Sequence, residues 1–183
     1  MNEEHGIIIR EAYKDYEPPF DVVRIVNRLL AGVPNTRLAG LKTVVLSSSA
    51  NLSKPVRKAK AHARGKSYEL GKCRGRYHQK WKNESAWIEL WVDNMLMSCP
   101  KPLLWVNILR DFAIADTLFH ELGHHIHYSQ APEHKEKEDV ADKWDKRLSR
   151  QYFRRRYWYW MPLFLLLWLI LKPFGLFKKR RKN

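Results

Sequence analysis

The sequence predicts an α+β fold in which a small mixed sheet with an edge strand packs against helices, followed by a C-terminal apolar membrane segment. Three observations predict it. Two short strand-like segments are interspersed with longer segments of helical periodicity. An apolar run with basic flanks stands near the end of the chain. Hydrophobic residues make up 45% of the chain, which is enough for a core and excludes a wholly disordered protein.

The first elements follow from the apolar pattern. Residues 20–32 place their apolar side chains on one broad helical stripe, with Asp21 as the expected N-cap. Residues 41–49 form an expected short buried strand that a serine cluster closes. Residues 86–92 alternate between two faces, which predicts a strand with one face in the core.

Between these strands lies a strongly basic stretch, residues 54–82, with eleven Lys or Arg and one acidic residue. It shows no convincing period and is expected to be a long loop or hairpin insertion. A second basic cluster, residues 146–156, has six Lys or Arg and no acid. Contact with anionic lipid headgroups is the functional interpretation we favour for both stretches. A nucleic-acid surface is the less favoured interpretation for 54–82, and a solvated insertion is the plain one.

The remaining helices lie in the second half of the chain. Residues 103–126 are apolar nearly all round, as expected of a central buried helix. A further helix, rich in charge, is expected to follow the turn at residues 129–132 and to run towards residue 156.

The central helix contains the pattern HExxH, formed by His120, Glu121 and His124. Four residues advance about 400° on a helix, so the two histidines lie on one face, one turn apart, and can share one small cation. Zn²⁺ prefers such nitrogen ligands, and Glu121 is placed to take a proton from a water molecule at the metal. Burying these three polar residues in an apolar helix is explained if a metal organises them.

A third ligand is expected from another element. His127 is on the same stripe as His120, but seven residues of helix separate their backbones by about 10 Å, too far for one tetrahedral site. Glu138 on the next helix is the favoured ligand. Asp142, four residues later, is the expected second-sphere partner, accepting a hydrogen bond from a ligand histidine. Glu136, His134 and Asp142 are the alternative third ligands.

The residues HELGHH (120–125), followed after a short turn by E-x-x-A-D, resemble the gluzincin branch of zinc metallopeptidases, and specifically small, minimal members of the thermolysin-like zincin fold. The resemblance covers roughly residues 20–145. It implies one zinc ion per chain, bound by His120, His124 and Glu138. It also implies that Glu121 is the general base of peptide-bond hydrolysis.

The same resemblance implies that the edge strand, expected at residues 86–92, pairs with an extended polypeptide substrate. One departure concerns the oxyanion. Larger members carry a Tyr or His for it on a separate helical domain, for which this chain has no room. The candidates here are Tyr128, His125, His127 and Tyr152, without a ranking.

Residues 157–177 form the apolar run, with Arg residues before it and the cluster KKRRK after it. This pattern predicts a single C-terminal membrane segment, either a full span or a re-entrant one. The N-terminal residues lack the features of a signal peptide, so we expect a cytoplasmic catalytic domain. The expected organisation is a metallopeptidase domain over residues 1–150 and a membrane segment over residues 151–183.

Together these features predict a membrane-anchored zinc metalloendopeptidase that acts on a cytoplasmic or membrane-proximal protein. Two other classes remain open. One is a DNA-associated HExxH protease, which the basic stretch favours and the anchor and the glutamate ligand disfavour. The other is a non-hydrolytic metal-binding sensor or scaffold.

Overall fold

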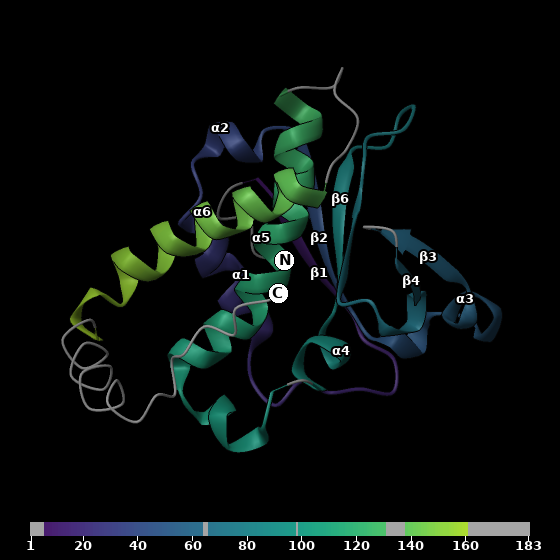
Figure 1. Ribbon diagram of the computed structural model, residues 1–183, viewed down its shortest axis with the longest axis horizontal. Coiled ribbons are helices and arrows are strands. Elements are labelled where there is room, and N and C mark those ends of the chain that lie inside the picture. The colour runs from purple at the N-terminus through teal and green to yellow at the C-terminus, as the bar shows by residue number, and fades with distance from the viewer. Residues whose placement is uncertain (1–5, 64–65, 98, 131–137, 161–183) are drawn as a thin grey trace, which may run out of the picture. The chain divides into compact units, whose positions relative to one another are not determined.

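The computed structural model describes residues 6–63, 66–97, 99–130 and 138–160 (Figure 1). The chain divides into two units, Met1–Tyr152 and Phe153–Asn183. The strands are β1 (Ile8–Ala12), β2 (Leu41–Ser47), β3 (Lys60–Ala63), β4 (Lys66–Glu69), β5 (Gly75–His78) and β6 (Ala86–Trp91). The helices are α1 (Val22–Ala31), α2 (Asn35–Leu38), α3 (Lys54–Lys58), α4 (Val92–Met97), α5 (Asn107–Gln130) and α6 (Glu138–Arg156).

A four-stranded mixed sheet organises the first unit, with strand order β1-β2-β6-β5. The first three strands are parallel, and β5 runs antiparallel to β6. Helix α1 connects β1 to β2 and packs with α5 on one side of the sheet (Figure 1). Strands β3 and β4 form a separate antiparallel hairpin. The predicted fold class, an α+β minimal zincin fold, is therefore corrected to a mixed α/β arrangement of a four-stranded sheet with packed helices.

The predicted edge strand is wrong. Strand β6, which covers residues 86–91, lies inside the sheet, paired with β2 on one side and β5 on the other. The strand at that end of the sheet is β5, within the basic stretch that was expected to be a loop or hairpin insertion. Alternation along β6 reports which face is buried and carries no information about pairing at its two edges. Strand β5 is four residues long and mostly polar, so no apolar pattern marks it.

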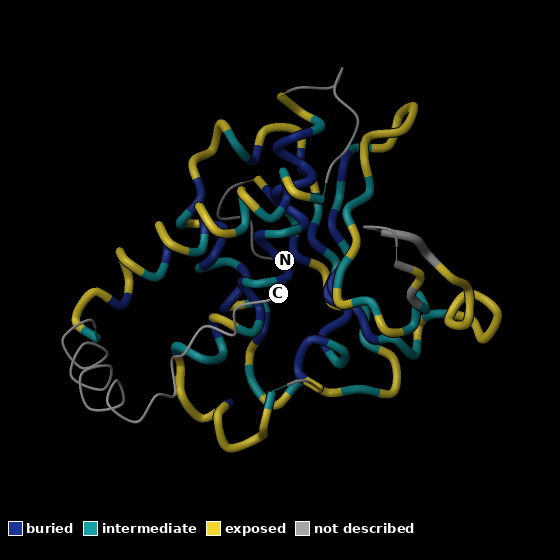
Figure 2. Tube along the Cα trace, in the orientation of Figure 1, coloured by how far each residue is buried: buried dark blue, intermediate teal, exposed yellow. Residues whose placement is uncertain are grey.

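The core lies between this sheet and α1 and α5, and Figure 2 shows buried backbone along all of them. Val44, Leu46, Ile88 and Leu90 alternate along β2 and β6 and are fully buried. Helix α1 begins as expected, because the Asp21 carboxylate accepts a hydrogen bond from the Arg24 N–H at 2.8 Å. Burial of apolar side chains from both layers stabilises this packing and fixes how α5 lies on the sheet.

A buried carboxylate ties α1, α5 and α6 together. Asp111 on α5 is fully buried and accepts hydrogen bonds from the guanidinium of Arg28 and, at 2.6 Å, from the hydroxyl of Tyr152. Arg28 Nε also donates to the Tyr152 hydroxyl oxygen at 3.2 Å. Burial, with the hydrogen bond to Asp111, raises the pKa of Tyr152 well above its usual range. The carboxylate is thus fully paired, and α5 continues through this position without a break.

The expected C-terminal membrane segment requires correction. Within the described parts of the chain, no helix is long and apolar enough to cross a membrane. The long helix α5 is too polar, since it contains both Arg110 and the buried Asp111, and α6 is rich in charge up to its end at Arg156. Of the apolar run, only residues 157–160 are described, and they include a 3₁₀ turn; 161–183 lie outside the described residues. The expected membrane location rested on this segment and is corrected by the same finding.

We expect Asp111→Ala to lower the free energy of unfolding by about 3–5 kcal/mol, because it leaves the Arg28 charge and the Tyr152 hydroxyl without their buried acceptor. Urea denaturation of the full chain measures this. Asp116→Ala is the matched control on the same helix: its exposed pair with Arg74 should contribute less than about 1 kcal/mol. Equal destabilisation by the two variants would contradict the role given to Asp111.

Candidate metal centre

Helix α5 presents two histidines toward one point. His120 and His124 lie one turn apart, with their Nε2 atoms 3.2 Å from each other and their rings nearly perpendicular. Leu118, Phe119 and Leu122 are fully buried around them and anchor the helix in the core. The motif therefore has the geometry that its helical spacing predicts. The buried helix holds both imidazole rings so that their Nε2 atoms point toward each other.

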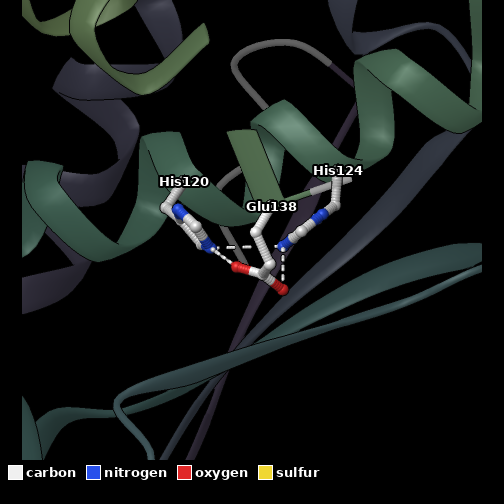
Figure 3. A group of neighbouring side chains, drawn as sticks. All are labelled: His120, His124 and Glu138. Atoms are coloured by element: carbon white, nitrogen blue, oxygen red, sulfur yellow. Dashed lines mark hydrogen bonds and ion pairs between the residues drawn. The ribbon is translucent and has the colours of Figure 1, made fainter. Parts of the chain in front are cut away.

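Glu138, the first residue of α6, completes the group (Figure 3). Its two carboxylate oxygens lie 3.4 Å from His120 Nε2 and 3.8 Å from His124 Nε2. One donor atom from each of the three residues lies within 4.8 Å of the others. The structure thus brings together the three residues that the sequence predicted as metal ligands.

A glycine inside the motif allows α6 to come this close. A Cβ placed on Gly123 would lie 2.7 Å from the carbonyl oxygen of Ala141 and 2.8 Å from its Cα. A side chain at position 123 would therefore push the α6 backbone away. Gly123 and the fully buried Ala141 together set the crossing that delivers Glu138 to the histidines. Sequence reasoning gave Gly123 no role.

Asp142 lies one turn after Glu138 and holds His120 from behind. Its Oδ1 is 3.2 Å from His120 Nδ1. A carboxylate in this position accepts the Nδ1–H, which leaves the Nε2 lone pair directed at Glu138 and His124. This is the arrangement expected for Asp142 as a second-sphere residue. The alternative ligands Glu136 and His134 lie outside the described residues.

The donor set fits a zinc ion in chemistry and in spacing. Two imidazole nitrogens and one carboxylate oxygen form a usual set for zinc in sites that keep a position for water. Ligands that bind a tetrahedral zinc at about 2.0–2.1 Å lie about 3.3 Å from one another. The separations of 3.2, 3.4 and 3.8 Å between these donors are close to that value. His127, buried further along α5, is outside the group.

The side chain of Glu121, on α5, lies against β5, the end strand of the sheet. The residue is 7% exposed, and its Oε1 is 3.2 Å from the position that a Cβ on Gly75 would take. Burial, together with the charge of Glu121, raises the pKa of the nearby Cys73 thiol. Sequence reasoning missed Gly75, although a lone glycine in a strand is a signal of close backbone approach.

Two of the four oxyanion candidates are engaged elsewhere. The Tyr152 hydroxyl donates to Asp111. His125 is 1% exposed, with Nε2 3.2 Å from the Ala39 carbonyl oxygen and Nδ1 3.3 Å from the Tyr77 hydroxyl. Burial lowers the pKa of His125, which favours the neutral imidazole in this place.

The other two candidates, Tyr128 and His127, are neighbours near the end of α5. Tyr128 stacks on Tyr77 of β5 with ring centroids 5.8 Å apart, and His127 makes an edge contact with Tyr128 at 6.0 Å. His127 is buried and Tyr128 is partly exposed. Neither belongs to the group formed by the two motif histidines and Glu138.

Comparison with protein-family models, with curated proteins and with solved structures gives no match to this chain. The chemistry open to the site follows from its own residues.

We expect Glu138→Ala to weaken zinc binding at least 100-fold, because one of three ligands is lost, and Asp142→Asn to weaken it about 10–100-fold. Competition with a chromogenic chelator, followed by elemental analysis, measures both. Asp139→Asn is the control, since Asp139 is an exposed acid on the same turn of α6 and outside the group. Wild-type zinc affinity in a folded Glu138→Ala protein would show that Glu138 is not a ligand.

Proposed function

We propose that this chain is a zinc-dependent metallopeptidase that hydrolyses internal peptide bonds with Glu121 as general base. One observation carries the proposal. His120, His124 and Glu138 converge within a few ångströms, and the neighbouring residue in the motif is a buried glutamate against the end strand of the sheet.

Each residue has a definite part in this proposal. When bound, zinc supplies Lewis acidity that brings the pKa of a water molecule to about 7. Glu121 accepts a proton from the attacking water on a carboxylate oxygen and passes it to the departing amine. Asp142 keeps the proton of His120 on Nδ1, so that Nε2 remains a ligand. Burial of Glu121 and His124 limits the access of bulk water to this side of the site.

The position of β5 supports an extended peptide as the substrate. The Trp91 N–H donates to the Arg74 carbonyl at 2.8 Å, so the backbone groups of Arg74 face β6. Backbone groups alternate in direction along an antiparallel strand, which directs those of Gly75 to the other side. A peptide added there as a further strand would pass close to the Glu121 carboxylate. In this proposal the strand that pairs with the substrate is therefore β5, and not residues 86–92.

A non-hydrolytic metal sensor would use the same three ligands. It has no use for a buried carboxylate at position 121, held against Gly75 at a cost in desolvation. The placement of Glu121 therefore favours hydrolysis over a purely binding role.

We expect Glu121→Gln to retain zinc and to lose about 10²–10⁴-fold in kcat, because glutamine cannot accept the proton of water. Digestion of a peptide library by the zinc-loaded full chain, with elemental analysis of both proteins, measures this. Equal turnover by the two proteins would rule out Glu121 as the base, and absence of zinc-dependent cleavage by wild type would rule out the proposed function.

We expect Gly75→Ala to reduce kcat at least tenfold with zinc content unchanged. The new Cβ would lie 2.7 Å from Thr117 Cγ2 and 3.1 Å from Glu121 Cγ, so the glutamate or the strand must move. Thr117→Ser removes the nearer methyl group and should restore part of the activity in the double variant. Full activity of Gly75→Ala alone would show that the contact between β5 and Glu121 is not required.

A further inference from the structure

The face of β5 that points away from α5 carries an exposed arginine. Gly75 and Tyr77 contact α5, through Thr117 and His125 respectively, so alternation places Arg76 and His78 on the opposite face. Arg76 is exposed, and among the described residues it forms no ion pair. The strand that lies beside Glu121 therefore places the Arg76 guanidinium on the face that an added strand would share.

Strand β6 shows how a neighbouring strand meets this face. Glu89 lies directly opposite Arg76 in the register, and its Oε2 is 3.9 Å from His78 Nε2. The Glu89 carboxylate thus lies beside His78, and in the described part of the chain it forms no ion pair with Arg76. The free side of β5 offers the exposed Arg76 side chain to a strand added there, because directly opposite side chains in a sheet lie about 4.5–5.5 Å apart.

We infer that the substrate of this site is an acidic polypeptide segment, one of whose Asp or Glu side chains pairs with Arg76 as it adds to β5. The inference rests on the proposed peptidase function. The sequence around β5 adds further positive charge, since residues 54–82 contain eleven Lys or Arg and one acid. Lys80 and Lys82 continue beyond β5 in the turn to β6. Lys or Arg side chains on a substrate strand would be repelled by the positive charge of Arg76.

Aromatic contacts on this face favour a peptide over a nucleic acid. Trp87 and His78 stack on each other with ring centroids 3.7 Å apart and planes 2° from parallel. Their facing ring surfaces are therefore not offered to a nucleobase, which is how single strands are usually held. Trp81, at the tip of the hairpin, is 64% exposed and is the ring that a nucleic acid would use instead.

The test measures binding, so that it does not depend on catalysis. Three labelled peptides of one sequence carry Glu, Gln or Lys at every second position, and their affinity for the zinc-loaded Glu121→Gln full chain is measured by fluorescence anisotropy. A single-stranded oligonucleotide is the fourth probe. Arg76→Glu is the test variant. Arg10→Glu is its matched control, because Arg10 lies in the same cross-strand row at the opposite end of the sheet.

We expect the Glu peptide to bind about tenfold more tightly than the Lys peptide, because an attractive cross-strand pair with Arg76 replaces a repulsive one. The preference should shrink as salt rises, persist in Arg10→Glu and reverse in Arg76→Glu. Equal affinity for the three peptides, or a preference that survives Arg76→Glu, would overturn the inference. Tighter binding of the oligonucleotide that is lost in Arg76→Glu would also overturn it. Absence of hydrolysis by wild type with the peptide preference intact would count only against the proposed function.

Discussion

The close crossing of α5 and α6 at Gly123 is the constraint on which the site depends. Any side chain at this position would collide with the backbone of Ala141, so glycine is required for the two helices to lie this near. The crossing places the first turn of α6 over the motif. Glu138 then faces the two histidines while Asp142 supports His120 from the other ring nitrogen. A small shift of α6 would separate all of these contacts at once, because they share one helix.

A second glycine, Gly75, allows a strand of the sheet to approach α5 closely, as Gly123 allows α6 to do. It lets β5 lie against Thr117 and Glu121, so that the carboxylate is held between the helix and the strand. The exposed ion pair of Arg74 with Asp116, at 2.8 Å, joins the residue before the strand to α5. Two glycines thus position the ligand group and the proposed base, and the buried network at Asp111 holds the three helices behind them.

The ligand geometry could be predicted from the sequence, because a spacing of four residues on a helix fixes which side chains share a face. This applied to His120 with His124 and to Glu138 with Asp142. The sheet was predicted less well. Strand β5 was missed because its Gly, Arg and His residues carry no apolar pattern, and β6 was taken for the edge. The membrane segment was inferred from the apolar run at residues 157–177 and its basic flanks, and no described helix is long and apolar enough to cross a membrane.

X-ray absorption spectroscopy at the zinc edge tests the central claim most directly. For the zinc-loaded full chain, the account predicts a first shell of nitrogen and oxygen only, at about 2.0–2.1 Å, with the outer scattering of two imidazoles. In Glu138→Ala the imidazole signal should remain while the shell loses one oxygen ligand. A sulfur neighbour at about 2.3 Å, which would place Cys73 or Cys99 at the metal, or a shell without imidazole would contradict it.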